Sequence, residues 1–132
     1  RAVWSQVASC LSAAPSTSRW RGRLGSLPSS TAAVCDVAGS SMPNCEVVAD
    51  FGNGMVYVSG AAEGVSAQVF QHRWGQVTQR AAHATLLSVP PDWKAGIDVF
   101  GQRPAGWEVM RELKLRFDPN GTLNRGRFVG RL

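Results

Sequence analysis

Apolar residues recur every three to four positions in four segments of the chain, a spacing typical of the buried face of a helix. The segments that this spacing predicts to be helical are 2–11, 31–38, 63–80 and 105–117. The clearest stripe lies in the third segment and consists of Ala67, Phe70, Trp74 and Val77. We expect Phe70, Trp74 and Trp107 to lie in the core rather than to act as stacking platforms.

Four shorter runs, bounded by Gly, Pro and Asn, predict strands over 19–27, 45–51, 55–59 and 83–89. Gly52-Asn53-Gly54 between the second and third runs predicts a hairpin. From residue 19 to residue 89 the order is therefore strand, helix, strand, strand, helix, strand. This is the split β-α-β, or ferredoxin-like, order of an α+β fold: an antiparallel sheet with helices on one face, here with extra N-terminal and C-terminal helices. The order does not indicate a function, because this arrangement supports many unrelated activities.

With 132 residues, the chain is expected to form one domain with a core of its own. No basic leader precedes an apolar run, and the longest apolar runs are far shorter than the ~20 residues that span a bilayer. We therefore expect neither a signal peptide nor a transmembrane segment. Because the chain opens at Arg1 without a methionine, we expect it to be an interior or C-terminal piece of a longer protein.

Cys10, Cys35 and Cys45 are an odd number of cysteines without a C-x-x-C spacing. A structural zinc site needs four ligands at short paired spacings, and a secreted scaffold needs an even number of cysteines. We therefore predict no metal site and buried, reduced thiols in a cytoplasmic protein.

The net charge of +5 comes from 14 Lys and Arg against 9 Asp and Glu, with arginine in the majority. Arginine favours the recognition of carboxylates or phosphates and ion pairs at interfaces. A basic chain also raises the alternative of nucleic-acid binding, and solvated basic surfaces explain the same excess without any ligand.

The most informative motif ends the chain: residues 113–129 read L-K-L-R-F-D-P-N-G-T-L-N-R-G-R-F-V. Pro119 cannot continue a helix, so the motif predicts a helix end, a turn over 118–121 and a short tail. The string resembles the C-terminal signature of FAD-linked oxidases of the vanillyl-alcohol oxidase and p-cresol methylhydroxylase type, whose usual form is L-K-x-x-F-D-P-x-G-x-x-N-P-G-R/K. Further segments resemble the FAD-binding subunit of bacterial glycolate oxidase, in that family's order; they are 23–30, 82–90 and 97–101.

The resemblance implies that residues 1–132 are the C-terminal cap, or substrate, domain of an FAD-dependent oxidoreductase subunit that oxidises a small 2-hydroxy acid such as glycolate. The N-terminal FAD-binding domain is absent from the sequence, and with it the glycine-rich phosphate-binding loop. Gly52, Gly54 and Gly121 are predicted to lie in turns, not between a strand and a helix N-terminus. The isolated fragment is therefore expected to be inactive. The implied partners are the flavin domain of the parent chain and further glycolate oxidase-type subunits, including an iron-sulfur subunit. The implied location is the cytoplasm, either free or peripheral at the inner membrane.

In this family the tail returns to the flavin, so Asn124, Gly126 and Arg127 are the predicted cofactor contacts. An Asn amide donates and accepts hydrogen bonds, and a guanidinium stabilises an anionic flavin or a substrate carboxylate. A purely structural tail is the alternative. No catalytic residue can be assigned: His72 is predicted to face solvent, and His83 to be structural.

The sequence departs from the family at several positions. Arg125 stands where the family has Pro, Ala81-Ala82 replaces Gly-Gly, and Phe100 replaces Trp. If the paired glycines need a left-handed backbone, the loop before the last strand must differ.

The alternative to an enzyme domain is a binding module: a free-standing, basic, ferredoxin-like domain that binds RNA or a protein. Such RNA-binding modules stack bases on aromatic residues of the central strands. Tyr57 is the only aromatic residue of 55–59, and no K/R-G-F-G-F-V-x-F string is present. The oxidase interpretation, which involves no nucleic acid, is therefore preferred.

Overall fold

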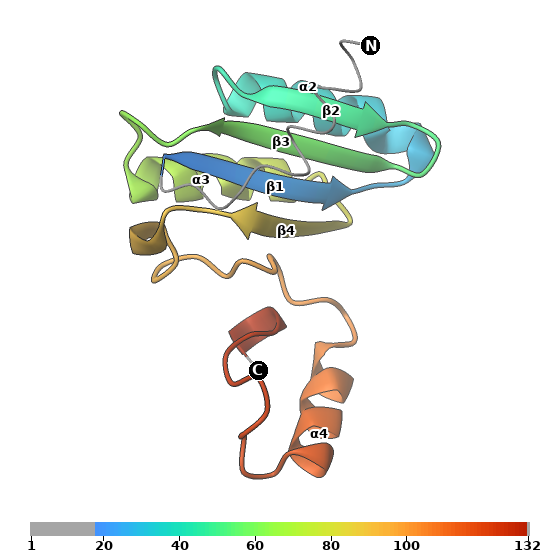
Figure 1. The fold of residues 1–132 in the computed structure, drawn as a ribbon. Coiled ribbons are helices and arrows are strands. Elements are labelled where there is room, and N and C mark those ends of the chain that lie inside the picture. Colours follow the sequence, from blue (N-terminus) through green and yellow to red (C-terminus); the bar gives the residue numbers. More distant parts are fainter. Residues whose placement is uncertain (1–17, 132) are drawn as a thin grey trace, which may run out of the picture.

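The computed structural model describes residues 18–131 as an α+β fold around one four-stranded antiparallel sheet (Figure 1). The predicted helix over 2–11 and Cys10 lie outside the described residues. The strands are β1 (Arg19–Gly25), β2 (Glu46–Asp50), β3 (Met55–Ala61) and β4 (His83–Ser88). The helices are α2 (Thr31–Ser41), α3 (Ala67–Thr78) and α4 (Trp107–Phe117), with short 3-10 turns at Pro28–Ser30, Pro91–Trp93 and Val129–Arg131.

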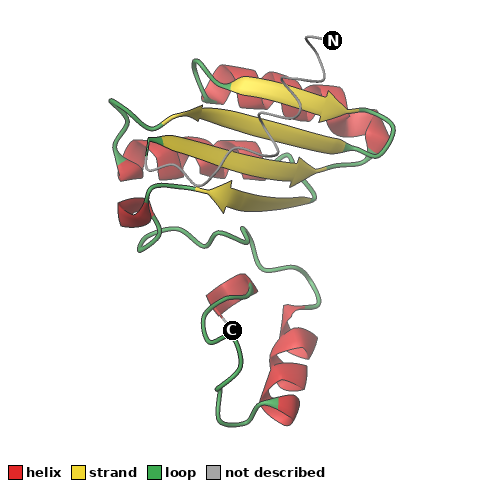
Figure 2. Cartoon of the chain, viewed as in Figure 1, coloured by secondary structure: helices red, strands yellow, loops and turns green. Residues whose placement is uncertain are grey.

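The order of elements from β1 to β4 is strand, helix, strand, strand, helix, strand, as the sequence predicted. In space the strands follow the order β2-β3-β1-β4, so β1 and β3 are central and every neighbouring pair is antiparallel. α2 and α3 lie together behind the sheet, and the opposite face carries no described helix (Figures 1 and 2). The α+β class is thus confirmed.

The predicted start of the third helix was wrong, and α2 runs to Ser41, three residues past its predicted end at Ala38. α3 begins at Ala67 and not near Glu63, because Ser66 caps its N-terminus by accepting a hydrogen bond from the Val69 backbone N–H at 3.3 Å. Glu63 lies in the preceding loop, outside the first turn of the helix.

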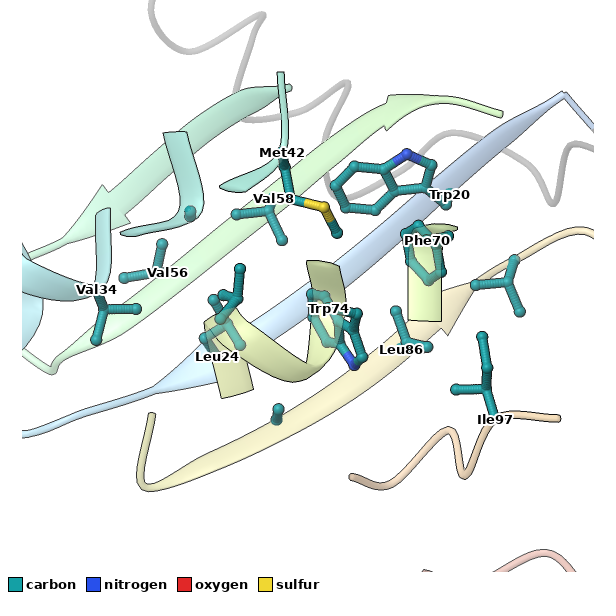
Figure 3. Packing of buried hydrophobic residues seen from close by; sticks show 14 of the residues in the cluster. Trp20, Leu24, Val34, Met42, Val56, Val58, Phe70, Trp74, Leu86 and Ile97 are labelled. Atoms are coloured by element: carbon teal, nitrogen blue, oxygen red, sulfur yellow. The ribbon is translucent and has the colours of Figure 1, made fainter. Parts of the chain in front are cut away.

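The core lies between the sheet and its two helices (Figure 3). Phe70 and Trp74 of α3 are buried, as predicted, and their rings stack with centroids 6.1 Å apart. Trp20 of β1 packs against both rings, and Trp93 packs against Phe70 at 4.7 Å. The aromatic cluster therefore packs α3 against β1, one of the two central strands of the sheet.

The hairpin between β2 and β3 is confirmed and is fixed by contacts to the end of β1. Gly54 has φ +71°, and a Cβ there would approach the Ser26 carbonyl oxygen to 2.0 Å. The Ser26 N–H donates to the Gly54 carbonyl at 2.8 Å. A side chain at position 54 is thus excluded by both the backbone conformation and the available space.

α4 and the tail stand apart from the sheet (Figure 1) and contribute little to the core. α4 has no buried residue, although its apolar residues also recur at a spacing typical of one helix face. Trp107 is only half-buried, so its predicted place in the core was wrong: its ring stacks under the Arg103 guanidinium, 4.2 Å from the ring centroid. The end of the tail contacts the loop that follows β4, where the Gly130 N–H donates to the Asp98 carboxylate at 2.8 Å.

Cys35 and Cys45 are free thiols, and both are half-buried rather than fully buried as predicted. Cys45 donates to the Ala38 carbonyl at 3.6 Å, and burial raises the pKa of both thiols. Within residues 18–131, no group of three His, Cys, Asp or Glu side chains is placed to hold a metal ion.

Candidate functional site at the C-terminal tail

Asp118 organises the junction between α4 and the tail. Its carboxylate accepts hydrogen bonds from the Thr122 N–H at 2.8 Å, the Thr122 hydroxyl at 2.9 Å and the Leu123 N–H at 2.8 Å. The Lys114 ammonium, one helical turn earlier, forms an ion pair with the same group. Because the Lys114 ammonium and the backbone N–H groups of Leu123 and Thr122 all donate to the charged form, the pKa of Asp118 lies well below its usual range.

The turn predicted at 118–121 is confirmed, since the Gly121 N–H donates to the Asp118 carbonyl at 3.0 Å. A second reversal follows: Asn124 and Gly126 have φ +48° and +69°, and the Arg127 N–H donates to the Asn124 carbonyl at 2.9 Å. Asn tolerates this left-handed backbone better than most side chains. The two reversals fold the tail back beside α4.

This folding brings two of the three predicted contacts into one hollow of about 550 Å³. Its lining consists of Met110, Lys114, Leu123, Asn124, Arg127 and Phe128. Gly126 instead lines a neighbouring hollow of about 350 Å³ beside Asp98 and Arg131. Phe128 borders both hollows, which are therefore adjacent. The three predicted residues are close in sequence but line two different hollows.

The larger hollow is positively charged. Lys114 also donates to the Leu123 carbonyl, so its ammonium is held at the wall. The Arg127 guanidinium forms no hydrogen bond or ion pair with any other residue between 18 and 131, and it remains free to meet an anion. The Asn124 amide is likewise without a side-chain partner in the described chain, which leaves a donor and an acceptor at the hollow.

These residues fit one edge of a flavin ring but not a whole FAD. Ligand pockets commonly enclose about 300–1,000 Å³, and this hollow lies within that range. A pyrophosphate needs a cradle of backbone N–H groups, often at a helix N-terminus. The glycines considered for that role, Gly52, Gly54 and Gly121, lie in turns as predicted.

Neither histidine of the chain borders the two tail hollows. His72 is exposed on α3, as predicted, with Gln76 3.4 Å away. His83 is also exposed, and its ring lies over β1 in the space that a side chain at Gly25 would fill.

The departures from the family pattern are accommodated locally. Arg125 braces the tail by donating from Nε to the Gly121 carbonyl at 3.1 Å. Ala81 and Ala82 do not adopt a left-handed backbone, so their replacement of Gly-Gly causes no conformational strain.

The sequence analysis missed a second group of charged residues, on β1. Arg19, Arg21 and Arg23 alternate with residues that face the helices, so all three belong to the face of the sheet opposite α2 and α3. The R-x-R-x-R string was the available signal, because its period of two matches that of a strand.

No family model, no curated protein and no solved structure matches this chain. The link to FAD-linked oxidases therefore rests on the motifs of the sequence itself. Among the described helices, none combines the length and the apolar character needed to cross a membrane.

Proposed function

We propose that this chain is the C-terminal cap domain of an FAD-dependent oxidoreductase subunit that oxidises a small 2-hydroxy acid such as glycolate. The observation that carries the proposal is that Asn124 and Arg127, two residues of the tail motif, line one hollow beside α4. If the tail had only a structural role, these two polar side chains would not need to line one hollow without hydrogen-bonding other described side chains.

In this proposal FAD supplies the acceptor for a hydride when it is bound, and the chain supplies positioning. The Asn124 amide hydrogen-bonds the mixed donor and acceptor edge of the flavin ring. The Arg127 guanidinium stabilises negative charge on the reduced ring or on a substrate carboxylate. Gly126 keeps the chain reversal that sets these two residues side by side.

The apolar side of α4 provides the contact with the flavin domain of the parent chain. Val109, Leu113 and Phe117 are 63%, 50% and 79% exposed, a large apolar surface for a single helix. The surface continues through Met110 into the hollow that holds Asn124, so one partner can cover both. Other glycolate oxidase-type subunits, one of them an iron-sulfur protein, and a cytoplasmic or peripheral inner-membrane location belong to the same proposal.

The test is a titration with FAD, followed by flavin fluorescence, of the chain alone and mixed with a separately expressed flavin domain. We expect tight binding only in the mixture, and at least tenfold weaker binding with Asn124→Gly. Glycine keeps the left-handed backbone of position 124, so this variant removes the amide without straining the turn.

The matched control is Asn120→Ala, because Asn120 is exposed in the same tail and does not border the hollow. Equal weakening by both variants would assign the effect to tail folding and not to contact with the cofactor. Failure of the two parts to associate would overturn the proposal.

The alternative, a module that binds RNA or a protein, has weaker support. RNA-binding sheets of this topology stack two or three bases on aromatic side chains. Among the described strand residues on the face opposite α2 and α3, Tyr57 is the only aromatic one.

A further inference from the structure

The face of the sheet opposite α2 and α3 has a row of arginines along β1, one of its two central strands. Trp20 and Leu24 of β1 are buried on the helix side, so the alternation of the strand assigns Arg19, Arg21 and Arg23 to the opposite face. The three residues follow one another at i and i+2, which separates neighbours by about 7 Å along the strand.

Only the first of these arginines is neutralised by a carboxylate. Arg19 donates to Glu46 at 3.0 Å, and the Ser59 hydroxyl donates to the same carboxylate oxygen, also at 3.0 Å. Asp50, the other carboxylate on this face, accepts from the Gly52 N–H in the hairpin. Within residues 18–131 no carboxylate lies within ion-pairing distance of Arg21 or Arg23.

Arg23 is also half-buried, and its Nε is fully covered without a hydrogen-bond partner in the described chain. A buried donor without a partner is unfavourable, and native proteins pair such donors with few exceptions. Because Nε itself is covered, an added anion can reach Arg23 only through the terminal nitrogens of the guanidinium, and the positive charge of the group favours an anionic acceptor there.

The neighbours of Arg23 can complete such a site. The register places Tyr57 of β3 on one side of Arg23 and Thr85 of β4 on the other. The His83 ring covers the next outward position of β1, at Gly25. Two residues with hydroxyl groups and one with an imidazole thus occupy positions next to Arg23 in the sheet, and each of these groups can donate to an oxyanion.

We propose that Arg21 and Arg23 form a binding site for a small oxyanion, a carboxylate or a phosphate, on the face of the sheet opposite α2 and α3. The planar guanidinium presents paired N–H donors that match the geometry of both groups. The site uses no residue of the tail, and its occupation does not depend on FAD.

The test is calorimetric titration of the chain at low salt with inorganic phosphate and with glycolate, with chloride at equal ionic strength as the reference. We expect one of the two anions to bind, with at least tenfold weaker affinity for Arg23→Gln and Arg21→Gln. Preference for phosphate or for glycolate identifies the ligand class. Arg23→Lys should bind with intermediate affinity, because it keeps the charge but loses the paired donors.

Arg80→Gln is the matched control, since Arg80 is exposed just after α3 and its side chain forms no ion pair with another residue of 18–131. Thermal unfolding of each variant shows whether it is folded. Equal weakening by Arg80→Gln, or binding of neither anion beyond the chloride reference, would overturn the site. So would saturable binding of single-stranded RNA to a chain that binds neither small anion. Failure of the FAD titration would leave the site standing, because the two experiments use different residues and ligands.

Discussion

Among single residues, Gly22 and Gly75 lie in very different surroundings. A Cβ at Gly22 would come within 2.3 Å of the Trp74 ring, whereas a Cβ at Gly75 would meet nothing within 4 Å. We expect Gly22→Ala to lower the free energy of unfolding by about 1–3 kcal/mol, because the aromatic cluster must shift. Gly75→Ala should raise the free energy of unfolding by about 1 kcal/mol, since alanine favours the helix interior. Urea denaturation measures both changes, and a loss of stability in both variants would contradict this account of the core.

Asp118 is a second single residue with a measurable effect, because its contribution to the stability of the folded chain depends on pH. Because its pKa is lowered in the folded state, the contribution is present above the ordinary aspartate pKa of about 3.9 and is lost as the pH falls below that value. We expect Asp118→Asn to lower the melting temperature at pH 7 and to expose the Leu123 amide to hydrogen exchange. The difference from the native chain should begin to narrow below about pH 4 and should narrow further as the pH falls, because the pKa in the folded state lies well below the ordinary value. Asp92→Asn is the control, because Asp92 is exposed and accepts no hydrogen bond from a described side chain. A gap that persists unchanged at pH 3 would contradict the assigned charge effect.

At the scale of elements, α3 and α4 both carry apolar residues at helical spacing, but only those of α3 are buried. Phe70 of α3 is 1% exposed, whereas Phe117 of α4 is 79% exposed. We expect Phe117→Ser to change the free energy of unfolding of the isolated chain by no more than about 0.5 kcal/mol. Phe70→Ala should cost about 3–5 kcal/mol.

The same Phe117→Ser variant should weaken association with the flavin domain, because it removes apolar surface from the proposed contact. Pull-down with the separately expressed flavin domain measures this effect. A variant that unfolds the isolated chain, or that associates normally, would contradict the role assigned to the exposed face of α4.

At the scale of the whole molecule, the charge is concentrated away from the core. Residues 102–131 contain seven Lys and Arg against three Asp and Glu, which accounts for most of the net charge of +5. The sheet and its two helices bury the aromatic cluster, while α4 and the tail offer apolar and basic surface. The expectation that the chain alone does not oxidise glycolate stays a prediction, and the FAD titration bears on it directly.

The candidate site was predictable in part. The F-D-P motif predicted the turn at 118–121, because proline ends the helix and glycine permits the reversal. Local rules could not show that Asn124 and Arg127 share a hollow while Gly126 lines its neighbour. That separation depends on the left-handed backbone at Asn124 and Gly126 and on the position of Phe128 between the two hollows.

The sequence by itself determined the order and type of the elements from β1 to α4, because residue periodicity and turn residues act over a few neighbouring positions. It also determined the alternation that sets the β1 arginines apart from Trp20 and Leu24. Only the tertiary structure decided which apolar stripe is buried. α3 has the sheet beneath it and α4 does not, and burial depends on partners brought together from distant parts of the chain. The absence of a carboxylate within ion-pairing distance of Arg23 among residues 18–131 was decided in the same way, since β3 and β4 supply the neighbours of β1 in the sheet.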